Sequence, residues 1–231
     1  MSEQKEYRQA RFTRPPGATE VLLVRHGESA PFREGVPVPL TDGHGDPPLD
    51  PVGEQQAERV ADRLVAEDLS AIYVTSLQRT VQTAAPLASR LGMEPLVEPD
   101  LREAFLGEWE GEMFRKHAAE GHPLMKQVMR EERWDVIPGA EPTDAFRVRT
   151  MTAINAIAGR HRDQCVAVFT HGGVIGQILS DATGSRPFAF LGADNGSISH
   201  LVVHGERWIV RRFNDTAHLH PGFTIAPEPV I

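Results

Sequence analysis

Short runs of consecutive apolar residues alternate along this chain with longer segments in which apolar residues recur every three or four positions. The short runs are typical of strands buried on both faces, and they lie at residues 21–24, 69–75 and 166–170. The segments with helical spacing lie at residues 55–67, 76–91, 144–160 and 174–181. Strands that alternate with helices in this way predict an α/β fold with a mainly parallel sheet.

The other parts of the chain have weaker patterns. Residues 197–203 and 208–213 indicate two strands joined around Gly205, an antiparallel pair at the edge of the sheet, and residues 95–98 indicate a short strand. A long loop is expected over residues 30–48, and a weak helix interrupted near 121–123 over residues 114–133. We expect one domain over residues 19–222, with flexible termini at 1–18 and 223–231.

Composition narrows the classes of partner. The chain has 231 residues and a formal net charge of -8, which argues against nucleic acid or an anionic membrane as the main partner. Cys165 is the only cysteine, so an intrachain disulfide is excluded and a reducing, cytoplasmic location is expected. No secretory signal and no apolar run long enough to span a bilayer are visible in the sequence.

The predicted strands end on residues that handle anions. Arg25 and His26 follow the first strand, and Arg79 lies in the helix after the second. His171 and Gly172 follow the third strand. Parallel strands present their carboxyl ends at one edge of a sheet, so these residues should meet there. Guanidinium groups match phosphate oxygens, imidazole supplies a nucleophile or base, and helix N-termini beginning near 76 and 172 add N–H donors, so the sequence predicts a phosphate site.

The segments that carry these residues resemble those of the histidine phosphatase superfamily, also called the phosphoglycerate mutase-like family. They are LVRHGES (23–29), PLDPVGEQQA (48–57), TSLQRTVQTA (75–84), LRE (101–103) ahead of GEWEG (107–111), THGG (170–173) and NDTAHL (214–219). The blocks stand in family order across residues 21–219, which makes the resemblance specific. It implies the phosphoglycerate mutase-like fold, a three-layer sandwich with helices on both faces of the sheet.

The resemblance also implies roles for individual residues. His26 would be the nucleophile that forms a phosphohistidine, and Glu103 would give a proton to the leaving alcohol and later take one from water. The implied phosphate-binding residues are Arg25, Arg79, His171, Ser29 and Gly172. Two nearby guanidinium groups would favour the neutral imidazole, and a backbone carbonyl near Gly27 would hold the Nδ1 proton. The implied substrate is a small phosphorylated molecule, with no metal and no other cofactor.

Alternatives stay open for several of these roles. Ser29 either donates to the phosphate or caps its loop. Other candidates for the proton donor are Glu28, Glu108 and Glu110. Many family members carry an Asn shortly after the Arg-His-Gly-Glu block, which this chain lacks, and Arg33 is a hypothetical substitute as an anion contact.

Two further patterns are interpreted as structural. Residues 42–46 place Asp, His and Asp at a spacing found in metal sites, but the set of ligands is incomplete, so we expect no metal there. Trp109 and Trp134 are interpreted as packing residues rather than as a platform for stacking.

Three functions compete at this stage: a phosphatase, a phosphoglycerate mutase-type phosphoryl transferase, and a catalytically silent phosphate-binding protein. The family's glycolytic mutases carry Arg-His-Tyr-Gly after the catalytic Glu and His-Gly-Asn-Ser at the second histidine. This chain has AFLG at 104–107 and HGGV at 171–174, which favours a phosphomonoesterase. Retention of every core residue disfavours a silent protein. The identity of the ester is not readable from the sequence, and a homodimer through an edge strand stays open.

Overall fold

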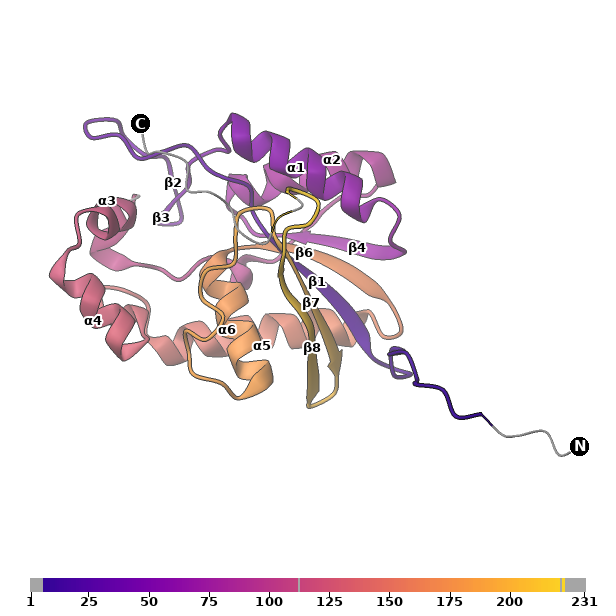
Figure 1. Ribbon diagram of the computed structural model, residues 1–231. Coiled ribbons are helices and arrows are strands. Elements are labelled where there is room, and N and C mark those ends of the chain that lie inside the picture. The colour runs from indigo at the N-terminus through magenta and orange to yellow at the C-terminus, as the bar shows by residue number, and fades with distance from the viewer. Residues whose placement is uncertain (1–5, 112, 221, 223–231) are drawn as a thin grey trace, which may run out of the picture.

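A six-stranded sheet lies at the centre of the computed structural model, which describes residues 6–111, 113–220 and 222 (Figure 1). The strand order is β5-β4-β6-β1-β7-β8. The strands are β1 (Thr19–Arg25), β4 (Leu69–Val74), β5 (Leu96–Val97), β6 (Cys165–Thr170), β7 (Ile198–His204) and β8 (Arg207–Asp215). β5, β4, β6 and β1 are parallel, whereas β7 is antiparallel to β1 and β8 to β7. The predicted parallel sheet with an antiparallel edge pair is confirmed.

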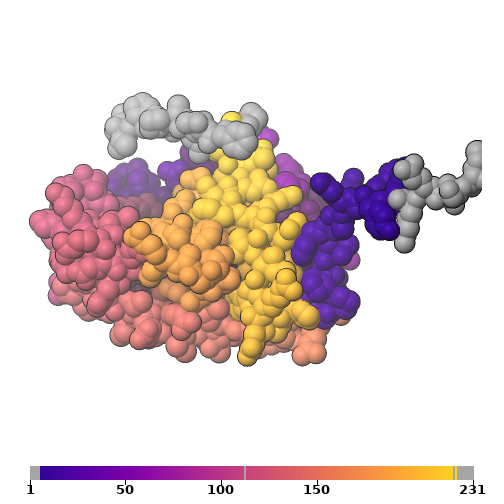
Figure 2. Space-filling view, turned by 60° about the horizontal axis from the view of Figure 1, so that its bottom comes forward, coloured from indigo at the N-terminus to yellow at the C-terminus, as the bar shows by residue number. Residues whose placement is uncertain are grey.

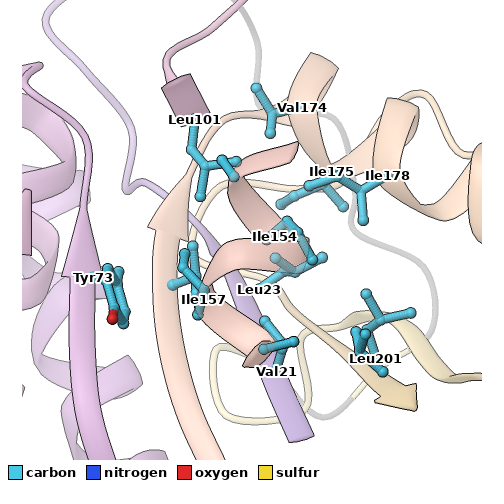
Figure 3. Packing of buried hydrophobic residues seen from close by; sticks show 14 of the residues in the cluster. Val21, Leu23, Tyr73, Leu101, Ile154, Ile157, Val174, Ile175, Ile178 and Leu201 are labelled. Carbon is cyan, nitrogen blue, oxygen red and sulfur yellow. The ribbon is translucent and has the colours of Figure 1, made fainter. Parts of the chain in front are cut away.

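Helices cover both faces of this sheet (Figure 1). Successive residues of β1 face opposite sides, so Val21 and Leu23 pack under α5 (Thr143–Arg160) and α6 (Gly172–Thr183), in the core drawn in Figure 3. Leu22 and Val24 pack under α1 (Pro51–Leu64) and α2 (Gln78–Leu91). This double burial explains the unbroken apolar run at 21–24 and confirms the three-layer sandwich.

A smaller group of helices lies to one side of the sheet, at the left of Figure 1. It contains η2 (Gly107–Trp109), α3 (Met113–Ala119), α4 (Pro123–Glu131) and η3 (Trp134–Val136), whereas η1 (Pro99–Leu101) packs against α5. Trp109, Val128 and Ile137 form its buried core. The predicted interruption is confirmed, because Gly121 takes a left-handed φ of 66° and Pro123 begins α4.

The loop at residues 30–48 and the start of α2 differ from expectation. The loop contains a small antiparallel pair, β2 (Leu40–Thr41) with β3 (His44–Gly45). α2 begins at Gln78 rather than at Ser76, and its N-cap residue Leu77 has no side chain that can cap. Asp46 supplies the cap instead, because its Oδ1 accepts a hydrogen bond of 2.8 Å from the Gln78 N–H. The long loop is therefore part of the support for α2.

The loop after β1 and the first turn of α1 pack backbone against backbone. A Cβ on Gly27 would lie 2.5 Å from the carbonyl oxygen of Gly53, and a Cβ on Gly53 would overlap the carbonyl oxygen of Glu28. The Asp50 N–H also donates to that Glu28 oxygen at 3.0 Å. Only glycine fits at both positions, because the atoms that a Cβ would meet belong to the backbone and cannot shift without a large cost in free energy.

The N-terminal residues extend from one side of the molecule (indigo in Figure 2). Several contacts tie them to it; for example, Arg14 donates to the Asp163 carbonyl at 2.6 Å, and the Arg211 guanidinium lies 3.9 Å from the Phe12 ring centroid. Residues 1–5, 221 and 223–231 lie outside the described residues, so the domain bounds and the flexible termini stay predictions. Among the described helices, none combines the length and apolarity that a membrane span requires.

Candidate active site

The carboxyl ends of three neighbouring strands meet at one edge of the sheet. β6 lies between β4 and β1, and the register pairs Arg25 with Thr170, so β1 and β6 end at the same level. His26 follows β1 directly and His171 follows β6, and their ring centroids lie 5.2 Å apart. The two histidines that the sequence places 145 positions apart (171 minus 26) are therefore neighbours in the fold.

His26 is buried, and its two ring nitrogens have different partners. Nδ1 lies 2.7 Å from the Gly27 carbonyl oxygen, and Nε2 lies 3.2 Å from the Nε donor of Arg79. A carbonyl oxygen can only accept and a guanidinium can only donate, so Nδ1 carries the proton and Nε2 the lone pair. Burial, reinforced by the charges of Arg79 and Arg25, lowers the pKa of His26 well below its usual value. The imidazole is therefore neutral, with its lone pair on Nε2.

The loop at 193–196, which the sequence patterns did not mark, fixes the end of β1. The Asn195 side chain donates to the His26 carbonyl at 3.0 Å, and the Gly196 N–H donates to the Arg25 carbonyl at 3.1 Å. The Ala193 carbonyl accepts a 2.5 Å hydrogen bond from the Arg25 guanidinium. The backbone of the nucleophile candidate and the side chain beside it are thus held by one loop.

Arg79 stands in the first turn of α2 and is positioned by β3. Its Nη1 donates to the Gly45 carbonyl at 2.9 Å and lies 3.9 Å from the Asp46 carboxylate. Asp46 is itself 5% exposed. Its negative charge is compensated by the Gln78 N–H and by the Arg79 guanidinium, and its carboxylate orients both groups. The same acidic residue thus sets both where α2 begins and where its first guanidinium points.

Two buried nitrogens next to His26 have no hydrogen-bond partner within the described parts of the chain. His171 is fully buried, and its Nε2 lies 3.1 Å from the Thr75 hydroxyl, while burial and the charge of Arg79 lower its pKa well below the usual value. The Nδ1 of His171 and the Nε of Arg25 are buried and have no hydrogen-bond partner among the described residues. Buried polar groups are normally satisfied, so these nitrogens mark a place where a ligand can supply acceptors.

Glu103 is held at the start of α6. Its Oε2 accepts from the Gly173 N–H at 3.0 Å and its Oε1 from the Ala104 N–H at 3.0 Å. A Cβ on Gly173 would overlap the carboxylate, so the lack of a side chain at that position admits it. Arg149 fixes the Glu103 backbone by donating to its carbonyl at 2.9 Å, while pairing with Glu141 at 2.7 Å.

A cavity of about 370 Å³ opens over these groups. Five of the predicted site residues line it: Arg25, His26, Arg79, Glu103 and Gly172. The remaining lining consists of His44, Gly45, Ala104, Leu106, Trp109, Glu110, Phe114, Arg115, Met129, Trp134, Gly173, Leu191, Gly192 and Ala193. The other two predicted site residues, Ser29 and His171, are not among these described lining residues, and neither is Arg33, which is exposed. Arg33 therefore gains no support as an anion contact.

Arg115 is a cavity residue that sequence reasoning missed. It stands on α3, donates to the Ser29 hydroxyl at 2.6 Å and donates to the Ala30 carbonyl at 3.1 Å. Ser29 is 2% exposed, so its hydroxyl meets this guanidinium rather than solvent. One basic residue in a weakly amphipathic segment gives no signal that separates a cavity residue from a solvated one.

The alternative proton donors are placed differently from Glu103. Glu28 and Glu108 are exposed and do not line the cavity. Glu110 lines it, but its oxygens accept from the N–H groups of Leu106 and Gly45, both at 2.7 Å, and burial raises its pKa. Glu110 thereby fastens β3 to the loop ahead of η2. Within the described parts of the chain, no three acidic, histidine or cysteine side chains gather as a metal site would require.

Comparison with known proteins finds relatives that match most of the chain. A family model for the histidine phosphatase superfamily (branch 1) matches residues 21–216. Phosphoglycerate mutase-like protein 4 of Arabidopsis thaliana is 33% identical over 204 residues, 87% of this chain and 86% of the relative. A metal-independent phosphoserine phosphatase of the same plant is 32% identical over 205 residues, 87% of this chain and 83% of the relative.

Solved structures agree on the fold. A mycobacterial glucosyl-3-phosphoglycerate phosphatase superposes with a TM-score of 0.70 at 24% identity, over 86% of this chain and all of that one (100%). The chain belongs to the histidine phosphatase superfamily, within the branch that the family model names. Its fold is that of the phosphoglycerate mutase-like proteins, as expected from the six sequence blocks.

Proposed function

We propose that this protein is a phosphomonoesterase that hydrolyses a small phosphorylated metabolite through a phosphohistidine on His26. The observation that carries the proposal is a neutral, buried imidazole with its lone pair on Nε2, beside two buried nitrogens, the Nε of Arg25 and the Nδ1 of His171, that have no hydrogen-bond partner among the described residues. A phosphoryl group over Nε2 would supply acceptors for those nitrogens and for Arg79. The relatives named as phosphatases support the same conclusion.

In the first step the Nε2 lone pair of His26 attacks phosphorus while the ester P–O bond breaks. The proton stays on Nδ1, hydrogen-bonded to the Gly27 carbonyl, so the ring becomes a phosphorylated imidazolium without a tautomer change. Protonated Glu103 gives its proton to the departing alcohol oxygen, because a bare alkoxide is a poor leaving group at neutral pH. Arg25, Arg79 and His171 stabilise the negative charge that is redistributed over the phosphoryl oxygens.

In the second step water attacks phosphorus and the N–P bond breaks. The Glu103 carboxylate accepts a proton from that water, which restores its protonated form, and inorganic phosphate leaves a neutral His26. Gly172 begins α6 beside the guanidinium of Arg25, where a Cβ would lie in van der Waals contact with its Nε at 3.4 Å. Ser29 acts indirectly, because its hydroxyl accepts a hydrogen bond from Arg115 and positions that side chain at the wall of the cavity.

Mutase-type phosphoryl transfer is the second candidate function. The observation that favours it is the set of relatives named phosphoglycerate mutases, among them a probable one from Yersinia enterocolitica at 29% identity over 207 residues. A phosphatase and a mutase share the phosphohistidine and differ in whether water reaches it. The AFLG and HGGV segments, which lack the basic and amide groups of the glycolytic mutases, support the phosphatase.

The proposal is tested by measuring phosphate release from p-nitrophenyl phosphate beside a mutase assay with 3-phosphoglycerate. We expect phosphate release, an acid-labile phosphoenzyme and no net mutase product. His26→Ala should abolish both turnover and phosphoenzyme, whereas His204→Gln, at an exposed histidine, should leave both intact. Turnover that persists in His26→Ala would overturn the nucleophile, and efficient isomerisation of 3-phosphoglycerate would replace the phosphatase by the mutase.

Two predictions about the setting of the reaction remain. Burial raises the pKa of the Cys165 thiol to about 12, and an unreactive thiol supports its interpretation as a packing residue, while the reducing cytoplasm stays a prediction. β8 is an edge strand of the sheet, which supports the prediction of a homodimer. Sedimentation of the purified protein measures the oligomeric state directly.

A further inference from the structure

The cavity wall beyond the phosphate groups is apolar. Its large apolar side chains are those of Leu106, Trp109, Phe114, Met129, Trp134 and Leu191. The ring of Phe114 contacts the rings of Trp109 and Trp134, with centroids 6.2 and 5.8 Å apart, so the aromatic part of this wall is continuous. The two tryptophans were interpreted from the sequence as packing residues. They do pack with the core of α4, and they also face the cavity.

The charges along the same cavity are placed unfavourably for a second anionic group on the substrate. Arg25 and Arg79 stand beside His26, where the phosphoryl group is proposed to bind. Arg115 already donates to oxygens of Ser29 and Ala30. The other charged side chains on the lining are the carboxylates of Glu103 and Glu110. Beyond the phosphate groups, a substrate carboxylate would therefore meet two acidic side chains, apolar surface and a guanidinium that is already hydrogen-bonded to Ser29 and Ala30.

Met129 marks the outer end of the apolar wall. It stands near the end of α4, it lines the cavity, and it is 50% exposed. A large apolar side chain left in water at the mouth of a cavity gains free energy when an apolar group covers it. An ester whose alcohol part is alkyl or aromatic would cover Met129, whereas an ester of a small polar alcohol would leave Met129 exposed to solvent.

We propose that the substrate is a phosphate monoester of an uncharged, apolar alcohol, with an aromatic or alkyl group lying on the Phe114 and Trp134 wall. This inference rests on the proposed function and adds the class of ester. It separates this chain from the relatives whose names specify phosphoserine or phosphoglycerate, compounds that carry a carboxylate. Specificity would then come from α3, α4 and η3 rather than from the strand ends.

The test compares alkyl esters with similar leaving groups, so that differences in kcat/KM report binding of the alcohol part rather than the ease of P–O bond cleavage. The panel is 2-phenylethyl phosphate, ethyl phosphate and phosphoserine, assayed by phosphate release. We expect kcat/KM for 2-phenylethyl phosphate to exceed that for each of the others by about tenfold or more, since a single methylene in a fitted pocket already discriminates by that order. Equal or faster turnover of phosphoserine would overturn the inference and leave the phosphatase standing. Release from none of the esters would overturn the proposed function itself.

A matched pair of variants tests the wall directly. Met129→Lys places a cation at the cavity mouth, and Met129→Leu keeps the site apolar. We expect the lysine variant to lower the ratio of 2-phenylethyl phosphate to phosphoserine turnover by about tenfold, mostly through KM, and the leucine variant to retain the ratio. Melting curves of both variants, which should match that of the unmodified protein, report that the fold is intact. An unchanged ratio in Met129→Lys would overturn the inference.

Discussion

Gly173→Ala offers a sharp test of Glu103 as the proton donor, because it displaces the acid without removing it. The new Cβ would overlap the Glu103 carboxylate, which is the far end of a side chain and can swing away. The substitution should not destabilise α6 itself, because position 173 lies in its first turn and alanine is a better helix former than glycine. The variant should therefore fold with its acid out of place.

The two magnitudes can be worked out separately. A positioned general acid contributes about a hundred- to ten-thousand-fold, so the barrier for esters with poor leaving groups should rise by about 3–5 kcal/mol. For stability, the alanine gains about 1 kcal/mol of helix propensity and the lost hydrogen bond between the Gly173 N–H and the carboxylate costs about 1.5–3 kcal/mol. The net loss of about 0.5–2 kcal/mol leaves a folded protein.

The assay measures kcat/KM for esters whose alcohols range from p-nitrophenol to ethanol. We expect Gly173→Ala to lose little with p-nitrophenyl phosphate and about a hundredfold or more with ethyl phosphate, as in Glu103→Gln. Gly159→Ala is the matched control, because this glycine also lies in a helix and its new Cβ would meet no neighbouring side chain or strand within 4 Å. An equal loss with every ester, or none with ethyl phosphate, would refute the assignment of the acid.

Two further predictions concern stability. His26, His171 and His44 have lowered pKa values in the folded protein, mainly through burial, with that of His44 at about 4. The unfolded chain therefore takes up protons below about pH 6.5 that the folded protein refuses, and the free energy of unfolding should fall with decreasing pH by up to about 1.4 kcal/mol per pH unit for each histidine. Urea titrations between pH 7.5 and 5 measure this slope, and a flat profile would contradict it. Asp46→Ala should lower the free energy of unfolding by about 1–3 kcal/mol, and it should lower kcat/KM because α2 and Arg79 are held less firmly. Asp46→Asn keeps the hydrogen-bond acceptor for Gln78 and should recover most of the stability. Equal melting curves for the two variants would exclude the cap.

The sequence predicted the parts of the fold in which local pattern and burial coincide. β1 and β6 are buried on both faces, so their apolar runs are unbroken and easily recognised. The hairpin around Gly205 follows from two strand-like runs and a glycine that takes a left-handed φ of 57°. The site residues at strand ends could be predicted for the same reason, because the end of an apolar run fixes where the chemistry begins.

The parts that the sequence did not reveal depend on partners far away in the chain. The start of α2 was misplaced because its cap comes from Asp46, 32 positions before Gln78. The α3 and α4 segment gave a weak pattern because its apolar residues serve both a small core and the cavity wall. Arg115 and the loop at 193–196 reach the site only through tertiary contacts, for which no local spacing exists.

The position of β6 has a consequence for how this chain is made. β6 separates β1 from β4 in the sheet, although both of those strands are synthesised long before it. A nascent chain that has emerged only as far as α5 thus lacks the strand that hydrogen-bonds to both β1 and β4, so the facing edges of those two strands have no partner. His171 directly follows β6, so the second imidazole is synthesised immediately after the strand that lies between β1 and β4. A chain that ends before β6 therefore has neither a complete sheet nor a complete site.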